Sequence, residues 1–211
     1  MLSRPEPKWW SVPPAWQGET AFLVGGGPSV AGQDLARLRG RRVIAINSSY
    51  ALLPFADILF FGDLRWWNDH KDRLDGFAGR IVTCRKNPGG LKGLRREVFE
   101  LERQNPPGLA LHRSRVIFRR TSYAAAINLA VHLGCAEIVA LGLDGKRDAK
   151  GRAHHHAPHR WPTKPACWAE QLAELATLVE PLQQLGVRVR NASPGSAVEL
   201  WPHVDLEDIL R

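Results

Sequence analysis

The chain has 211 residues, of which 44% are hydrophobic, so it is long enough for one well-buried core and short for two independent domains. Its 29 Lys and Arg residues exceed its 21 Asp and Glu residues, and the resulting formal charge of +8 favours phosphorylated small molecules or nucleic acid as partners. No apolar run approaches the ~20 residues that cross a bilayer, and the N-terminal stretch lacks a signal-peptide core, so we expect a cytoplasmic protein without a membrane span.

Residues 1–18 contain several prolines and the tryptophans Trp9, Trp10 and Trp16, and they predict an irregular N-terminal segment. The tryptophans are suited either to cover a neighbouring subunit, which leaves a homo-oligomer open, or to pack on their own domain. We expect residues 19–211 to form one domain.

The first predicted strand, residues 22–24, runs into a turn made of Gly25, Gly26, Gly27, Pro28 and Ser29. Glycine adopts positive φ easily and leaves the backbone without Cβ atoms, and proline suits the first position of a helix. Free amides at that helix start are predicted to face an anion. The alternative is that the glycines only reverse the direction of the chain.

Two common nucleotide-binding motifs do not fit this turn. The dinucleotide fingerprint has a third glycine where this chain has Val30, and an acidic residue after the second strand where this chain has Asn47. A P-loop needs a lysine after its glycines, and Pro28-Ser29 supplies none. An NAD enzyme and a P-loop kinase are therefore disfavoured.

Apolar, β-branched stretches recur along the chain, and the intervals between them are long enough for helices. This alternation predicts an α/β fold with a mainly parallel central sheet flanked by helices. The stretches are residues 22–24, 43–46, 58–61, 81–83, 116–118, 138–141 and 187–189.

Two helices have clear sequence signals. Residues 121–134 carry apolar side chains at helical spacing and end at Gly134, which is suited to stop the helix. A second long helix is predicted between Pro165 and Gly186, and Pro181 inside it is expected to kink or divide it.

Three widely spaced cysteines, Cys84, Cys135 and Cys167, form no Cys-x-x-Cys pair. They indicate neither a disulfide framework nor a thiolate zinc site. We expect them to behave as small buried hydrophobic residues.

Polar residues follow several of the predicted strands, at residues 25–29, 47–49, 62–63, 121–122 and 142–144. In open α/β sheets ligands gather beyond the carboxyl ends of the strands, so we expect these residues to converge on one crevice. Residues 145–165, which are rich in His and basic side chains, are predicted to form an active-site loop beside it.

Four motifs, in this order, resemble the sialyltransferase-like fold. The fold is shared by family 42 bacterial sialyltransferases, flagellin-modifying nonulosonic-acid transferases and archaeal 6-hydroxymethyl-7,8-dihydropterin pyrophosphokinases, and short phage-encoded proteins resemble it too. The motifs are the Gly-Gly-Gly-Pro-Ser turn, the strand end at Asn47, Arg119-Arg-Thr-Ser before a helix, and Gly-Leu-Asp144 after the next strand.

The resemblance implies which residues approach a nucleotide donor. The matching positions are Gly26, Gly27, Ser29, Asn47, Asp63, Arg119, Thr121, Ser122 and Asp144. The first three would approach the nucleotide phosphate and ribose, and the others would lie near or bind the nucleotide-sugar. A purely structural interpretation also stands: Ser29, Ser122 and Asp63 are suited to cap helices, and Arg119 to be a surface cation.

The histidine-rich loop permits two chemistries. In the sialyltransferases a histidine ahead of the last long helix deprotonates the acceptor hydroxyl, and His159 stands at the matching place, with His156 as the next candidate. The competing interpretation is a metal site, in which His156 and His159 chelate together with Asp144 or Asp148. A plain solvated loop is the third interpretation.

The chain departs from the sialyltransferases in one respect. The tyrosines that stabilise the departing nucleotide phosphate in that family have no obvious counterpart here, where the tyrosines are Tyr50 and Tyr123. The basic residues of the loop, Arg152, Arg160 and Lys164, are candidates to replace them by charge.

The sequence therefore favours a single Rossmann-like nucleotide-binding domain over residues 19–211. It favours a nucleotide-dependent transferase that moves a sugar from a CMP-type nucleotide-sugar to an acceptor hydroxyl, with no required cofactor. One alternative is transfer of diphosphate from ATP to a pterin-like alcohol, which would need Mg²⁺. Another is a phage-derived protein that binds nucleic acid through its basic surface.

Overall fold

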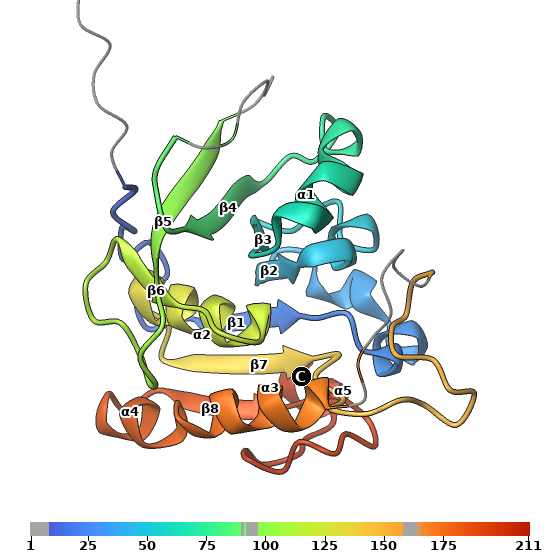
Figure 1. Cartoon of the computed structure of the whole chain (residues 1–211). Coiled ribbons are helices and arrows are strands. Elements are labelled where there is room, and N and C mark those ends of the chain that lie inside the picture. Colours follow the sequence, from blue (N-terminus) through green and yellow to red (C-terminus); the bar gives the residue numbers. More distant parts are fainter. Residues whose placement is uncertain (1–8, 90, 92–96, 158–163, 165) are drawn as a thin grey trace, which may run out of the picture.

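The computed structural model describes residues 9–89, 91, 97–157, 164 and 166–211 (Figure 1). In this part of the chain the strands form one sheet of eight strands in the order β6-β5-β4-β3-β2-β1-β7-β8, and every neighbouring pair is parallel. The α/β fold class with a parallel sheet, predicted from the sequence, is confirmed. The strands are β1 (Thr20–Val24), β2 (Arg42–Ile46), β3 (Ile58–Phe61), β4 (Arg80–Arg85), β5 (Val98–Gln104), β6 (Arg115–Ile117), β7 (Glu137–Leu141) and β8 (Arg188–Asn191).

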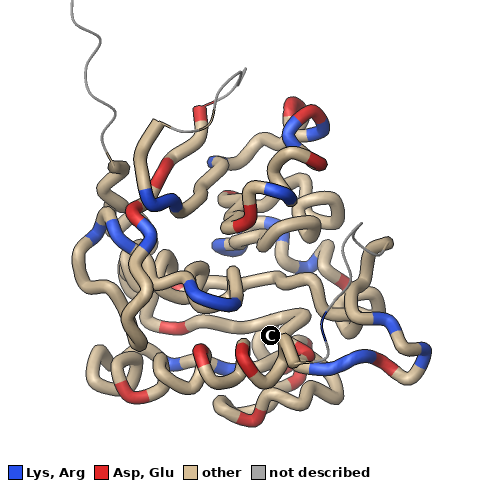
Figure 2. Tube along the Cα trace, in the orientation of Figure 1, with Lys and Arg blue, Asp and Glu red and all other residues tan. Residues whose placement is uncertain are grey.

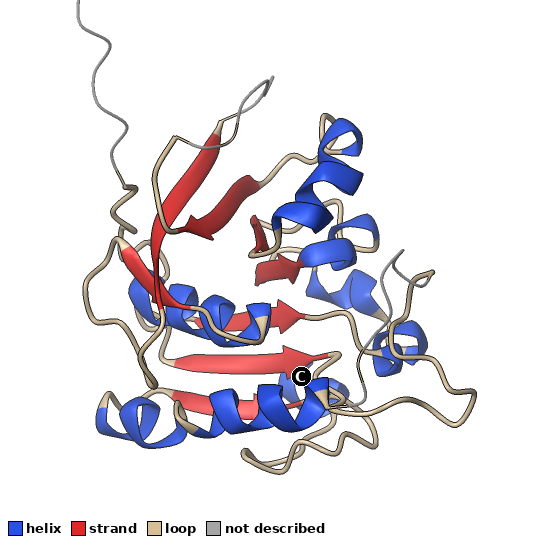
Figure 3. Ribbon diagram, viewed as in Figure 1, coloured by secondary structure: helices blue, strands red, loops and turns tan. Residues whose placement is uncertain are grey.

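Helices cover both faces of the sheet (Figure 3). The α-helices are α1 (Leu64–His70), α2 (Ser122–Leu133), α3 (Cys167–Ala176), α4 (Val179–Gln184) and α5 (Leu206–Leu210). The 3-10 helices are η1 (Pro28–Gly32), η2 (Leu35–Leu38), η3 (Asn47–Ala51) and η4 (Lys71–Arg73). Apolar residues of α2, α3 and the start of α4 pack on one face, whereas those of α1, α5 and the segments η1 and η2 pack on the other.

The strand β5 is the one strand of the described sheet that the sequence analysis missed. Its sequence, Val-Phe-Glu-Leu-Glu-Arg-Gln, alternates apolar and charged residues, and most of its side chains are half-buried. The search for continuous apolar runs overlooked this pattern, although alternation with period two is typical of a partly exposed strand.

The helix α2 begins and ends where the sequence predicts. The Thr121 hydroxyl accepts a hydrogen bond from the Tyr123 N–H at 3.1 Å and so caps the helix. Gly134 ends it with φ of 91°, a conformation that strongly favours glycine. The helix is buried along most of its length between the sheet and α3.

The second predicted long helix is divided into α3 and α4. Pro181 occupies the third position of α4, in the first turn, where its missing N–H removes no intrahelical bond. The division that Pro181 predicts is thus present, and Gly186 follows with φ of 68°. Pro165, the predicted start, lies outside the described residues.

The described end of the N-terminal segment packs on its own domain. The Trp16 side chain is buried, and the backbone N–H of Trp16 donates to the Leu133 carbonyl at 2.8 Å. The Val12 N–H donates to the Arg113 carbonyl at 3.1 Å, and Trp10 lies 4.9 Å from Phe99 between ring centroids. Of the two roles predicted for these tryptophans, packing on the domain is therefore observed for Trp10 and Trp16.

The expectation that the cysteines are buried is met by Cys84 and Cys135, whereas Cys167 is only partly buried. None of the three forms a disulfide within the described residues. Among the helices described by the structure, none has the length and apolar character to span a membrane.

The position of β1 determines where a ligand site is expected. Its neighbours are β2 on one side and β7 on the other, so the chain winds in opposite directions from this strand. The connections that leave neighbouring carboxyl ends therefore diverge and open a crevice there.

Candidate functional site

A pocket with a volume of about 270 Å³ opens at the carboxyl ends of the central strands. Its wall is formed by the segments that follow β1, β2, β3 and β7, by the start of α2 and by one side of α3. The structure brings together in this wall eight of the residues singled out by the sequence: Gly26, Gly27, Asn47, Asp63, Thr121, Ser122, Asp144 and His156.

Two of the predicted site residues that the structure describes are not in the wall. Ser29 lies behind it, bonded to Asp144. Arg119 is exposed outside the pocket, and its neighbour Arg120 lines the wall instead. His159 lies outside the described residues, so its role as a base stays a prediction.

Close packing, and not backbone conformation, accounts for the glycines of this turn. Gly25, Gly26 and Gly27 do not adopt the positive φ that the sequence analysis considered. Gly27 has φ of −62°. A Cβ atom there would overlap the Asp144 carboxylate, and it would lie 2.5 Å from the Gly142 carbonyl oxygen. A Cβ atom on Gly25 would overlap the Tyr123 ring. The turn and the end of β7 can approach each other only without these side chains.

The expectation of free amides at the start of a helix is also wrong, because Asp144 already binds there. The helix η1 is a single 3-10 turn. The Ser29 N–H donates to Asp144 Oδ1 at 3.2 Å, and the Ser29 hydroxyl donates to Asp144 Oδ2 at 2.9 Å. Burial raises the pKa of Asp144 above its usual value, although these bonds act in the opposite direction. A carboxylate of the chain itself therefore takes the place predicted for an external anion.

A second set of backbone amides, just before α2, is occupied in the same way by Glu174 of α3. The N–H groups of Arg119, Arg120 and Thr121 donate to its two carboxylate oxygens at 2.7, 2.6 and 2.8 Å. Glu174 is buried, so these bonds satisfy a charge that would otherwise be costly. The sequence analysis missed Glu174, whose one signal was an acidic residue beside Leu175 on a core-facing helix.

Asn47 combines backbone strain with an unsatisfied polar atom. Its φ of 52° is the one positive value among the described non-glycine residues. Its side-chain amide donates to the Ser122 hydroxyl at 3.3 Å, whereas its Oδ1 atom is buried with no hydrogen-bond partner among the described residues. Strain and an unpaired buried polar atom are costly and are typical of ligand sites.

Asp63 and Thr121 have structural roles as well as places in the pocket wall. Asp63 caps α1 by accepting the Arg65 N–H at 2.8 Å, and its Oδ2 pairs with Arg65 Nη2 at 2.9 Å. Thr121 caps α2, as described above. The capping interpretation from the sequence is confirmed for Asp63, whereas the cap of α2 is Thr121 and not Ser122, which is the first residue of that helix. Asp63 and Thr121 both also line the pocket.

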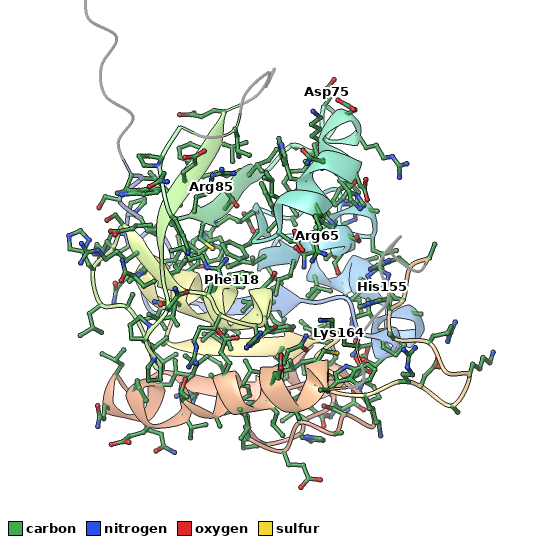
Figure 4. All side chains as sticks on the ribbon, in the orientation of Figure 1. Arg65, Asp75, Arg85, Phe118, His155 and Lys164 are labelled. Carbon is green, nitrogen blue, oxygen red and sulfur yellow. The ribbon has the colours of Figure 1, made fainter. Side chains whose placement is uncertain are left out.

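The histidine-rich loop folds across the glycine turn. The His155 N–H donates to the Gly26 carbonyl at 3.0 Å, and its ring Nε2 lies 3.2 Å from the hydroxyl of buried Ser49. That hydroxyl donates to the Gly25 carbonyl at 2.7 Å. Figure 4 shows His155 on the side of the molecule where the carboxyl ends of β1 and β7 lie. His155, which the sequence analysis did not single out, thus anchors the loop.

The two neighbouring histidines line the pocket as a stacked pair. The rings of His154 and His156 are 4.9 Å apart between centroids and 6° from parallel. Both rings lie beside Gly26, where a Cβ atom would be 3.4 Å from His154 Nδ1 and 3.8 Å from His156 Nε2. The ring Nδ1 of His156 is 2.7 Å from the Ala157 carbonyl oxygen. Burial lowers the pKa of His156, which keeps it neutral near pH 7.

The metal interpretation of the loop receives no support from the described residues. Among them, no group of three His, Cys, Asp or Glu side chains is arranged to hold a metal ion. The pair of His156 and His159 proposed from the sequence is not tested by this finding, because His159 lies outside the described residues.

The matched glycines Gly26 and Gly27 provide a test of the packing argument. We expect Gly27→Ala to lower the free energy of unfolding by about 1–3 kcal/mol, because the added methyl group displaces the Asp144 carboxylate. Gly26→Ala meets only ordinary contacts and should stay within about 1 kcal/mol of wild type. Urea denaturation of both variants measures the difference. Equal stabilities would contradict the packing argument.

The partly buried ring of His155 predicts acid sensitivity. Burial, reinforced by His156, lowers the pKa of His155 from 6.5 to about 4. The unfolded chain therefore binds this proton more tightly than the folded chain, so stability should fall as the pH drops below about 6.5 and continue to fall until about 4. We expect His155→Gln to reduce the loss of unfolding free energy between about pH 7 and 4.5, measured by urea denaturation. An unchanged pH dependence in this variant would show that His155 is not responsible.

Comparison with known proteins supports the fold. No protein-family model and no curated protein matches the sequence. Among solved structures, the chain is similar to the sialyltransferase CstII from Campylobacter jejuni in complex with a substrate analogue, cytidine-5'-monophosphate. The identity is 14%, the match covers 89% of this chain and 85% of that chain, and the TM-score is 0.52. The protein therefore has a sialyltransferase-like fold, which confirms that part of the resemblance seen in the sequence.

Proposed function

We propose that the protein is a nucleotide-dependent transferase that moves a sugar from a CMP-type nucleotide-sugar to an acceptor hydroxyl. The observation that carries this proposal is the convergence of most of the predicted donor-binding residues, all except Ser29 and Arg119, on one pocket at the point where the winding of the sheet reverses. The similarity of the fold to a sialyltransferase whose structure contains cytidine-5'-monophosphate supports the choice of donor.

The proposed donor site has polar and bare surfaces in the places that a nucleotide needs. Asn47 and Ser122 form a bonded pair on one side of the pocket, and both residues line it, so their polar groups are suited to contact the donor. Gly26 and Gly27 leave the backbone uncovered on another side, so that a ligand can approach closely. The pocket is only partly polar, because Phe118, Trp66 and Trp168 also line it.

In the proposed reaction, the acceptor oxygen attacks the anomeric carbon of the sugar. The bond from that carbon to the donor phosphate oxygen breaks, its electron pair leaves with the phosphate, and the acceptor proton passes to a base. His156 lines the pocket, and donation of its Nδ1–H to the Ala157 carbonyl leaves the lone pair on Nε2. We propose His156 as the base, with His159 as the second candidate from the resemblance.

The proposal requires no metal ion. The two pocket carboxylates suited to hold Mg²⁺ already have partners in the chain, Asp63 with Arg65 and Asp144 with Ser29. The sequence-based alternative, transfer of diphosphate from ATP, would need Mg²⁺. Metal dependence therefore discriminates between the two reactions.

Nucleotide binding is the first test. In calorimetry against CMP, CDP, UDP, GDP and ATP, we expect CMP to bind without added metal and EDTA to leave that binding unchanged. Asn47→Gly keeps a residue that accepts positive φ while removing the side chain, so we expect it to weaken CMP binding by about tenfold or more. Asn105→Gly, at an exposed asparagine outside the pocket, is the matched control.

Failure of every nucleotide to bind the wild-type protein would refute the proposed function. Binding of ATP that is lost with EDTA would favour the diphosphate transfer instead.

The role of His156 predicts a selective loss of turnover. We expect His156→Gln to lower the rate of CMP release from a CMP-sugar by a factor of about 100 or more, because the base contributes to the transition state. CMP affinity should stay within about threefold of wild type. The release of CMP, measured with a coupled assay, and calorimetry separate these effects. Full turnover in this variant would move the role of base to another residue.

A further inference from the structure

Two sets of backbone amides beside this pocket, of the kind that bind phosphate in α/β folds, already have acceptors in the chain. The Ser29 N–H after the glycine turn donates to Asp144, and the three N–H groups before α2 donate to Glu174. Both acceptors are carboxylates, so a phosphate placed against either set of amides would meet a negative charge. A donor phosphate therefore needs a different source of positive charge.

The described cationic side chains of the pocket wall are Arg120 and Lys146, and they differ in their surroundings. Arg120 Nη1 lies 3.4 Å from Glu170 Oε2, so part of its charge is already compensated. The Lys146 side chain is exposed at the pocket. Burial raises the pKa of the Asp144 carboxylate and the charge of Lys146 acts on it in the opposite direction, but among the described residues the structure shows no ion pair within 4 Å of Lys146. The neutral state of His156 removes that residue as a cation near pH 7.

The described basic residues that follow Lys146 in this loop either have partners of their own or do not line the pocket. Figure 2 shows the basic positions along the loop after β7. Arg147 donates to the Gly151 carbonyl at 2.8 Å, and its guanidinium lies 5.5 Å from the Trp168 ring centroid. Arg152, a candidate from the sequence, pairs with Asp148 at 2.7 Å and does not line the pocket. Lys164 is exposed but does not line the pocket, and Arg160 lies outside the described residues.

The backbone that carries Lys146 is held in a defined turn. Gly145 has φ of 66°, a conformation that strongly favours glycine. On the N-terminal side of it, the Leu143 N–H donates to the Ser193 hydroxyl at 2.9 Å, and the Asp144 carbonyl accepts the Ala197 N–H at 2.8 Å. These bonds tie the turn to the segment after β8, so the base of the lysine side chain is fixed at the pocket edge.

We infer that Lys146 binds the phosphate of the donor and stabilises the charge that develops on it when the sugar leaves. This inference rests on the proposed function. The ammonium group supplies the positive charge that the occupied amides cannot supply, and a flexible side chain allows it to follow the phosphate as the bond breaks. Tyr123 cannot bind the donor phosphate in place of Lys146. Its hydroxyl is buried and donates to the Leu23 and Leu141 carbonyls.

The experiment compares CMP with cytidine, which lacks the phosphate, in calorimetry at about pH 8, where an imidazole carries little charge. We expect Lys146→Met to weaken CMP binding by about tenfold or more and to leave cytidine binding within about twofold of wild type. Lys146→Arg should restore most of the CMP affinity. Lys150→Met, at an exposed lysine in the same loop that does not line the pocket, should behave as wild type.

The outcomes separate this inference from the proposed function. If wild type binds CMP and Lys146→Met weakens CMP and cytidine equally, or neither, then Lys146 is not the phosphate ligand while the proposed function stands. If wild type binds no nucleotide, the proposed function fails, and titration with inorganic phosphate still tests the residue: phosphate binding that Lys146→Met abolishes supports an anion site at Lys146. Absence of phosphate binding to wild type in that case would overturn the inference.

Discussion

The contact between Asp144 and the glycine turn is the constraint on which the rest of the pocket depends. It joins the ends of β7 and β1 through two hydrogen bonds to Ser29, and it requires that Gly27 carry no side chain. The turn is thereby drawn against β7, and its bare backbone faces the pocket. The His155 ring and the Ser49 hydroxyl fix the same turn from the other side.

The pocket uses carboxylates of its own chain where many nucleotide-binding folds use a ligand phosphate. Asp144 and Glu174 each satisfy backbone amides that point toward the carboxyl edge of the sheet. Such bonds make the turns rigid before any ligand arrives, because buried amides are costly when unpaired. Recognition of a ligand then falls to side chains, of which Asn47, His156 and Lys146 line the pocket.

The loop after β7 connects this rigid framework with the chemistry that we propose. Its first turn presents Lys146, and its histidines cover Gly26. The anchoring residue, His155, is partly buried with a pKa lowered to about 4, so the arrangement of the loop is favoured by the neutral imidazole. The proposed base and the proposed phosphate ligand therefore belong to one segment, which Asp144 and His155 both hold against the glycine turn.

Local patterns in the sequence determined most of the fold. Apolar runs located the strands except β5, whose alternating residues required a test for period two. Thr121 and Gly134 marked the ends of α2, and Pro181 marked the division between α3 and α4, because capping and the missing proline N–H act within one helical turn. The parallel winding also placed the polar strand ends in one pocket.

Only the tertiary structure decided which groups meet inside that pocket. Asp144 and Ser29 are 115 residues apart, and Glu174 is more than 50 residues from each of the amides that it binds. No local pattern separates a carboxylate that will occupy such amides from one that will face solvent, because the difference arises from the packing of distant elements. The same limit applies to the glycine turn, for which the sequence permitted both positive φ and a need for bare backbone. The structure shows that the close approach of Asp144 and Tyr123 excludes a side chain at Gly27 and Gly25.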